Sequence, residues 1–274
     1  METGGAAREG GVVSFLAEIL ASKRREVVDL RVGKATAGAR RPIDVAGVLR
    51  RSAGDRLRLL AEVKLRSPSA GPLSRALAPD ARAIAYAQAG AAMVSVLCDG
   101  PFFDGSWDHL AAARRSLDGA GLSVPLLAKE FVIDAAQIAM ASACGADSVL
   151  LIARIVDART LAELVGVARS HGLEPLVEVV DEGELRAGLD AGARVVGVNA
   201  RDLDTHAMDS ARAARVMAAI PRDVVAVHLS GLKTAVDVAR VAATRADAAL
   251  IGEALMRQED PRGLLGELVD ASGR

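Results

Sequence analysis

The chain alternates between amphipathic stretches and short runs of apolar residues, and this alternation recurs along its length. Four segments share one plan, in which an alanine-rich helix end, usually with a helix-stopping glycine, leads into a continuous apolar run: AQAGAAMVSVL, ASACGADSVLLI, LDAGARVVGVN and ATRADAALIG. A strand that is apolar on both faces is typical of a parallel sheet covered by helices. The repeat therefore predicts an α/β fold.

Four further apolar segments complete a set of eight expected strands: RLLAEVK, VPLLAKEF, LEPLVEVV and DVVAVHLSG. Helical patterns separate neighbouring strands by roughly 20 to 35 residues, and this spacing predicts a (β/α)8 TIM barrel. The alternative is an open, doubly wound sheet. That fold usually carries a Gly-x-Gly-x-x-Gly phosphate loop after its first strand, and the chain has none.

An amphipathic helix is expected ahead of the first strand. Four apolar residues follow helical spacing with charges on the opposite face: Val13, Leu16, Ile19 and Leu20. We expect this helix to dock on the barrel. The first residues, METGGAAREGG, indicate a disordered leader, since they carry glycine and acidic residues rather than a basic end feeding an apolar core. We expect one barrel domain over 1–274, in which 1–50 is a flexible leader and N-terminal helical extension.

Composition and charge narrow the possible partners. The 274 residues are 51% hydrophobic, and 34 basic and 35 acidic residues leave a net charge of -1. Such a chain can bury a large core but lacks the strong field that favours binding to nucleic acid or an anionic membrane, and no apolar run reaches membrane-spanning length. Cys98 and Cys144 stand alone, and the four histidines are scattered. We therefore expect a protein of the reducing cytoplasm that has no disulfide bond and no metal site. These histidines are His109, His171, His206 and His228.

Polar residues stand where the expected strands end, which is where barrel enzymes place their working groups. In LLAEVKLRSPSAGPL, alternation along a strand sends Glu62, Lys64 and Arg66 to one side, which is costly unless the charges are paired or used. A layer of salt bridges between neighbouring strands is the structural alternative. The other strand-end candidates are Lys129, Glu130, Glu178, Asn199, Arg201, His228, Ser230, Gly231, Gly252 and Glu253.

Two of these strand ends are candidates for phosphate binding. Ser230 and Gly231 follow the seventh expected strand, and Gly252 and Glu253 follow the eighth. Both turns can present backbone N–H groups to an anion, as barrels commonly do at these positions, and the Glu253 side chain should point away from it. The alternative is that both glycines are ordinary turn residues.

Six motifs resemble those of the indole-3-glycerol phosphate synthase family in order and spacing: AEVKLRSPSAGPL, VSVLCDGPFFDGSWDHL, LLAKEFVIDAAQI, LVEVVDEGEL, VGVNARDLDTHAMD and ALIGEALM. The resemblance covers nearly the whole chain. It implies ring closure, decarboxylation and dehydration of 1-(2-carboxyphenylamino)-1-deoxyribulose 5-phosphate, without metal or organic cofactor. It also implies a cytoplasmic enzyme of tryptophan biosynthesis that could interact with other enzymes of the pathway.

The resemblance also assigns roles to individual residues. Lys129 would be the general acid at the ribulose carbonyl, Glu178 its partner acid or base, and Lys64 the group that binds the anthranilate carboxylate and assists proton transfer. Glu62 and Asn199 would orient hydroxyls and lysines. Ser67, with Pro68, would shape a mobile loop over the site, unless Ser-Pro-Ser is a simple turn. The remaining substrate-binding residues would be Phe103, Phe131, Arg201, Ser230, Gly231, Gly252 and Glu253, although isolated phenylalanines are more often core.

One motif departs from the family pattern. Where the family usually has Ser-Glu-Ser-Gly, this chain has His228-Leu229-Ser230-Gly231, so Leu229 replaces an acidic residue that would accept hydrogen bonds. Alternation directs His228 toward the barrel wall. Three hypotheses remain: a synthase that is slowed or retuned, a relative in specialised metabolism acting on a modified anthranilate adduct, or a non-catalytic phosphate-binding barrel. The two lysines and Glu178 argue against the third, because a binding surface has no need of them.

Overall fold

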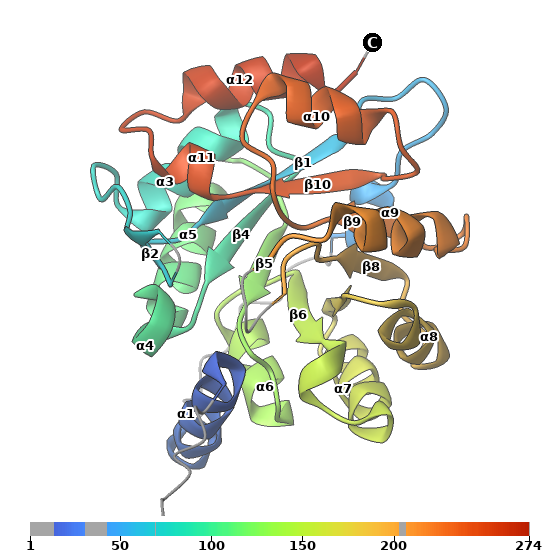
Figure 1. The fold of residues 1–274 in the computed structure, drawn as a ribbon. Coiled ribbons are helices and arrows are strands. Elements are labelled where there is room, and N and C mark those ends of the chain that lie inside the picture. The colour runs from blue at the N-terminus through green and yellow to red at the C-terminus, as the bar shows by residue number, and fades with distance from the viewer. Residues whose placement is uncertain (1–13, 31–42, 69, 203–206, 274) are drawn as a thin grey trace, which may run out of the picture.

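The described residues form a barrel of eight parallel strands in a computed structural model that describes 14–30, 43–68, 70–202 and 207–273 (Figure 1). Hydrogen bonds join neighbours in the order β1-β10-β9-β8-β7-β6-β5-β4, and β4 pairs with β1 to close the ring. All eight expected segments contain a strand, so the TIM-barrel prediction is confirmed. The strands are β1 (Arg58–Val63), β4 (Met93–Leu97), β5 (Leu126–Lys129), β6 (Ser148–Ile152), β7 (Glu174–Val179), β8 (Val195–Val198), β9 (Val225–His228) and β10 (Ala248–Ile251).

Helices cover the outside of the barrel, and local sequence fixes where most of them begin. Asp134 and Thr234 each form a capping box with the third residue of the following helix. At the other end, Gly145 after α6 adopts a φ of 83°, which ends the helix before β6. The covering helices are α3 (Pro79–Gln88), α5 (Trp107–Gly119), α6 (Ala135–Ala143), α7 (Ala158–Ser170), α8 (Glu182–Asp190), α9 (Ser210–Ala219), α10 (Ala235–Ala242) and α12 (Arg262–Ala271).

Short elements shape the rim of the barrel. They are α4 (Gly100–Phe103), the 3-10 turn η1 (Ala153–Ile155), α11 (Glu253–Met256), and the two strands β2 (Arg66–Ser67) and β3 (Gly71–Pro72), which pair antiparallel. This hairpin was not predicted. Because β1 ends at Val63, Arg66 does not continue the side of Glu62 and Lys64, and its guanidinium pairs with Asp104 at 3.2 Å. The expectation that Arg66 shares that side is wrong.

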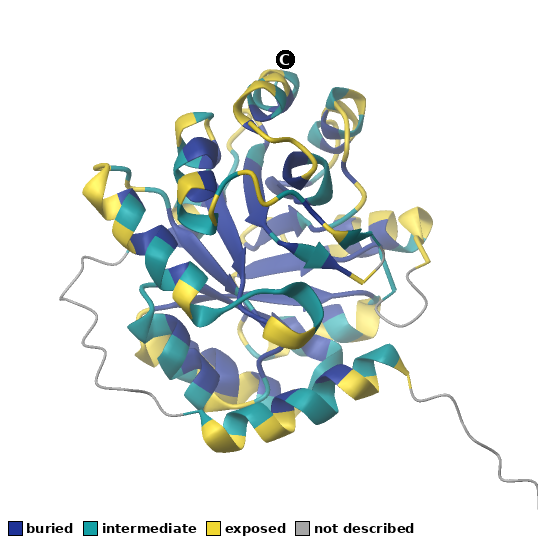
Figure 2. Ribbon diagram, turned by 90° about the vertical axis from the view of Figure 1, so that its left-hand side faces the viewer, coloured by how far each residue is buried: buried dark blue, intermediate teal, exposed yellow. Residues whose placement is uncertain are grey.

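Alternation along the strands divides the core into two layers. Leu60, Leu127 and Leu176 fill the barrel interior, whereas Ala61, Ala128 and Val177 pack outward against the helices. Figure 2 shows the strands as the buried centre of the molecule, with exposed residues on the outer helix faces. The same alternation therefore decides which strand side chains enter the barrel interior and which face the helices.

The expected N-terminal helix is present as α1 (Phe15–Asp29), and α2 (Val45–Leu49) follows before β1. Ile19 is buried, as an apolar docking face requires, while Val13 and the expected leader lie outside the described residues. Lys23 contradicts the simple amphipathic pattern, because it is only 1% exposed and its ammonium lies 2.7 Å from Asp99 and 3.0 Å from Glu130. In the described part of the chain, no helix is long and apolar enough to cross a membrane.

Candidate active site

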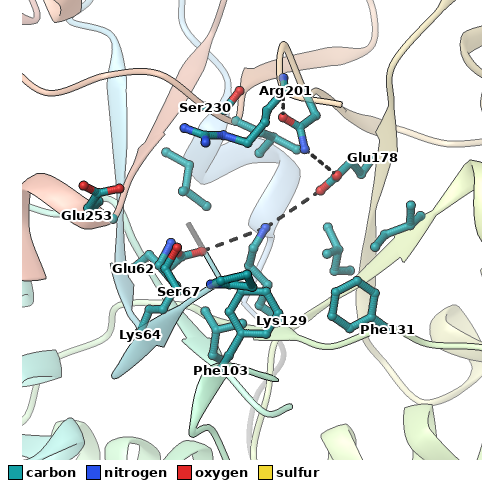
Figure 3. A pocket seen from close by; sticks show the side chains of 18 of the residues that line it. Glu62, Lys64, Ser67, Phe103, Lys129, Phe131, Glu178, Arg201, Ser230 and Glu253 are labelled. Carbon is teal, nitrogen blue, oxygen red and sulfur yellow. Dashed lines mark hydrogen bonds and ion pairs between the residues drawn. The ribbon is translucent and has the colours of Figure 1, made fainter. Parts of the chain in front are cut away.

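A pocket opens at the carboxyl ends of the barrel strands, between the strand-end loops and α1 (Figure 3). Every residue to which the resemblance assigns a role lines this pocket, whereas the strand-end candidate His228 does not. The charged and polar ones are Glu62, Lys64, Ser67, Lys129, Glu178, Asn199, Arg201, Ser230 and Glu253, and the others are Phe103, Phe131, Gly231 and Gly252. Their roles in binding and catalysis remain predictions.

Two lysines and two glutamates form the charged centre of the pocket. The Lys64 ammonium lies 2.6 Å from Glu62 Oε1. The Lys129 ammonium lies 3.9 Å from Glu62 Oε2 and 3.8 Å from Glu178 Oε2, between the two carboxylates (Figure 3). Both distances exceed an ordinary hydrogen bond, so Lys129 is attracted by both carboxylates without being committed to either.

Neighbouring groups fix the two carboxylates. Asn199 donates from Nδ2 to Glu178 Oε1 at 2.8 Å, and its side-chain oxygen Oδ1 accepts from the backbone N–H of Arg201 at 3.0 Å. Glu62 is 1% exposed. Burial alone would raise the pKa of Glu62, but the positive charges of Lys64 and Lys129 outweigh it and lower that pKa below its ordinary value. Glu62 therefore stays ionised and can hold both ammonium groups.

An apolar wall stands beside the charged centre. The Phe103 and Phe131 rings have centroids 6.0 Å apart at an interplanar angle of 34°, and both line the pocket. Three residues of α1 complete the wall, namely Phe15, Leu16 and Ile19. The sequence pattern identified two of them only as docking residues, because contacts between segments far apart along the chain leave no local signal.

A buried ion cluster holds α1 against this wall. Besides Asp99 and Glu130, the Lys23 ammonium contacts Glu26 at 2.8 Å. Asp99 also accepts from the N–H groups of Phe102 and Phe103, so one carboxylate joins α1 to the turn that carries the Phe103 ring. Burial raises the pKa of Glu130 to about 7, although Lys23 opposes the shift.

The opposite side of the pocket presents two strand-end turns. Ser230 Oγ accepts from the Ala200 N–H at 3.1 Å, which joins the ends of β8 and β9. Gly231 has a φ of 87°, a conformation that side chains disfavour. At Gly252 an added Cβ would lie 2.5 Å from Glu62 Oε1, so glycine there permits the close approach of the carboxylate.

Charged side chains at this rim follow the ends of three strands, β8, β9 and β10. Arg201 follows β8, and Lys233, which was not predicted, lines the pocket from the loop after β9. The Glu253 carboxylate pairs with Arg257 at 2.8 Å, one helical turn further on. Such a rim suits a dianionic phosphate, since it offers cations and backbone N–H groups together. Within the described ranges, no three His, Cys, Asp or Glu side chains are grouped so that they could hold a metal ion.

Leu229 occupies the position of the missing family carboxylate. Its side chain is 6% exposed, lines the pocket and belongs to the inner core with Leu176 and Leu250. The leucine lies so close to Gly197 that a Cβ there would be 2.5 Å from Leu229 Cδ1. His228 does not line the pocket, in agreement with strand alternation, so its ring does not replace the carboxylate.

A closed parallel barrel with charged and N–H-rich strand ends around an aromatic wall defines a TIM-barrel enzyme that handles an anionic aromatic substrate. The family model of indole-3-glycerol phosphate synthase matches residues 16–268. The chain therefore belongs to the indole-3-glycerol phosphate synthase family, the carboxy-lyases of tryptophan biosynthesis.

Individual relatives agree with this assignment. Indole-3-glycerol phosphate synthase of Mycobacteroides abscessus is 41% identical over 249 residues, which cover 90% of this chain and 89% of that protein. The enzyme of a Roseiflexus species is 42% identical over 265 residues, which cover 93% and 98%. Solved structures are more distant. A 3-hexulose-6-phosphate synthase has a TM-score of 0.60 at 18% identity over 78% of this chain and 99% of its own, which supports the fold alone.

Proposed function

We propose that this chain converts 1-(2-carboxyphenylamino)-1-deoxyribulose 5-phosphate to indole-3-glycerol phosphate, carbon dioxide and water. The observation that carries the proposal is the Lys129 ammonium held between Glu62 and Glu178 beside an aromatic wall. Ring closure of this substrate needs an acid at the ribulose carbonyl and a nearby base, and the pocket supplies both.

The shape of the pocket supports one orientation of the substrate. The anthranilate ring would lie against Phe103, Phe131 and the α1 wall, with its carboxylate at Lys64. The phosphate would lie at the opposite rim, where it meets Arg201 and the N–H groups of the Ser230–Gly231 and Gly252–Glu253 turns. Lys129, which comes from β5, would then face the reacting carbonyl.

The proton steps follow from this orientation. The ring carbon that carries the carboxylate bonds to the ribulose carbonyl carbon, and the carbonyl oxygen takes a proton from the Lys129 ammonium. The carboxylate then leaves as carbon dioxide, and its bonding electrons return to the ring. The Lys64 ammonium then protonates the new hydroxyl, which departs as water, and Glu178 takes the proton whose loss completes the indole. Glu62 and Asn199 hold Lys64 and Glu178, respectively, in place.

Leu229 supports a second candidate, a relative that accepts a modified anthranilate adduct. Its side chain adds apolar surface at a position where the family usually offers a carboxylate. A larger or less polar adduct would gain from that contact, whereas the standard substrate would lose a hydrogen-bond acceptor. The complete set of lysines and glutamates favours the standard substrate.

We further propose that residues 1–274 act as one barrel domain in the cytoplasm, that 1–50 serve as leader and helical extension, and that no metal or organic cofactor takes part. Association with other tryptophan-pathway enzymes is a further proposal, which co-purification of the tagged chain from its own cells would test. The near-neutral charge supports a small-molecule partner rather than nucleic acid.

The function is tested by incubating the purified protein with the anthranilate adduct and following indole fluorescence together with carbon dioxide release. The proposal predicts equal molar amounts of both products. Carbon dioxide without indole would indicate a reaction that stops early, and neither product would exclude synthase activity on this substrate. A panel of ring-substituted adducts then distinguishes the two candidate functions. The second candidate predicts a faster reaction with a substituted ring than with the standard adduct.

A further inference from the structure

His228 makes a contact that the proposed mechanism does not use. Its ring Nε2 lies 2.6 Å from the carbonyl oxygen of Ser230, two residues further along the chain. A carbonyl oxygen can only accept, so Nε2 must carry the hydrogen and donate it. The contact therefore assigns the Nε2–H tautomer of the ring and places a hydrogen bond directly beneath the turn after β9.

The location of the ring determines what this hydrogen bond does. Ala226 packs in the outer layer and Val227 in the barrel interior, so His228 lies on the outer side of β9 by alternation. The Ser230 carbonyl points to that outer side, toward the ring. Because the peptide unit is planar and trans, the N–H of Gly231 points in the opposite direction, toward the pocket.

The Gly231 N–H is available for a ligand. In the part of the chain that the structure describes, this N–H has no hydrogen-bond partner, and Gly231 lines the pocket. Gly231 adopts a φ of 87°. Because glycine tolerates many backbone conformations, the peptide between Ser230 and Gly231 could also adopt other orientations. A fixed N–H therefore requires a contact that holds the preceding carbonyl, and His228 supplies it.

We propose that His228 is a positioning residue that orients the Gly231 N–H toward the phosphate of the substrate. The inference rests on the proposed function, because the phosphate is placed at this turn. Burial lowers the pKa of His228, which keeps the ring neutral near pH 7.

Two substitutions of similar length separate the donor from the bulk of the ring. His228→Gln keeps an N–H donor near the Nε2 position, and His228→Met fills similar space without a donor. For each variant and the unmodified chain, we would measure kcat and KM with the phosphorylated adduct. Isothermal titration with inorganic phosphate gives the dissociation constant of the anion without turnover.

We expect His228→Met to raise both KM and the phosphate dissociation constant by about tenfold, with kcat within about twofold, and His228→Gln to remain near the unmodified chain. An unchanged phosphate constant in the Met variant would overturn the proposal, as would equal losses in both variants. If His228→Met fails to fold, His228→Leu replaces it. If both donor-less variants unfold while the Gln variant folds, the bond is a requirement for folding and the positioning role is wrong.

The two readouts keep this inference separate from the proposed function. If the unmodified chain binds inorganic phosphate but does not turn over the adduct, the synthase proposal fails and the phosphate constants still decide the role of His228. If turnover is normal and the Met variant binds phosphate as the unmodified chain does, only the inference about His228 fails.

Discussion

At the scale of single residues, the position of Lys129 fits the proposed proton transfer better than a static salt bridge. Its ammonium lies 3.8 and 3.9 Å from the carboxylates of Glu178 and Glu62, whereas Lys64 contacts Glu62 at 2.6 Å. A lysine that only neutralised a buried carboxylate would be expected to lie as close as Lys64 does. The longer separations leave room for a substrate oxygen to become its nearest partner.

Leu229 offers a direct test of the missing carboxylate. If the chain is an ordinary synthase that has lost one helper group, Leu229→Glu should raise kcat/KM on the standard adduct by about tenfold, because it restores a hydrogen-bond acceptor near the lysines. Rate profiles of both proteins provide the measurement. A retuned pocket would instead bind its ligand more weakly after the change, since a new charge must be desolvated. If the unmodified chain is already fully active and Leu229→Glu does not raise its kcat/KM, a carboxylate at position 229 is dispensable in this protein.

We predict that substitution of Gly231 impairs binding of the phosphate and not the rest of the reaction. Gly231→Ala should raise KM for the phosphorylated adduct by about tenfold or more, because a residue with a Cβ disfavours the φ of 87° that Gly231 adopts, and the turn must shift to relieve the strain. Gly121→Ala is a matched control, since Gly121 also has a positive φ, of 69°, but lies in open space after α5. Both variants should lose similar stability, and equal KM effects in the two would argue against a phosphate cradle.

At the scale of elements, α1 is a wall of the pocket that an ion cluster holds in place. Lys23→Met should lower the free energy of unfolding by about 3 to 5 kcal/mol, because Asp99 and Glu130 would remain buried without their cation. KM should rise as well, since α1 lines the pocket. Denaturant titration and steady-state kinetics measure both effects, with Arg24→Met on the exposed face of α1 as the control. A loss no larger than in that control would remove the cluster from this role.

The same cluster predicts a pH dependence. Glu130 has its pKa raised from 4.5 to about 7 in the folded state, so the folded protein binds a proton more tightly than the unfolded chain between these values. The contribution of Glu130 to stability is therefore fully present below pH 4.5 and is lost as pH rises toward 7. Glu130→Gln should flatten this part of the curve of unfolding free energy against pH. An unchanged slope would show that Glu130 is ionised throughout.

The elements differ in how far the sequence could predict them. Each barrel strand was predictable, because an apolar run after a helix-stopping segment is a local signal. The β2–β3 hairpin was not, since Arg66–Ser67 and Gly71–Pro72 are too short to show a pattern. Burial of Lys23 was also hidden, because its partners lie about 76 and 107 positions further along the chain, and charge on a helix normally indicates an exposed face.

At the scale of the whole molecule, closure of the barrel brings together groups that the chain keeps far apart. Glu62 on β1 and Glu178 on β7 lie on opposite sides of Lys129 only because β10, β9 and β8 complete the ring between them (Figure 1). The meeting of these residues at one pocket could be predicted, because a barrel places the carboxyl end of every strand on one face. The distances between the site side chains, the tautomer of His228 and the position of α1 beside the pocket could not be predicted, since they depend on side-chain packing after the barrel closes.

The central claim is that Lys129 donates the proton that closes the indole ring. The most direct measurement is kcat of Lys129→Met on the anthranilate adduct under saturating conditions, with circular dichroism to confirm the fold. The account predicts a fall in kcat by a factor on the order of 10² or more, and a comparable fall for Glu178→Gln. A folded Lys129→Met variant that keeps near-normal kcat would contradict it.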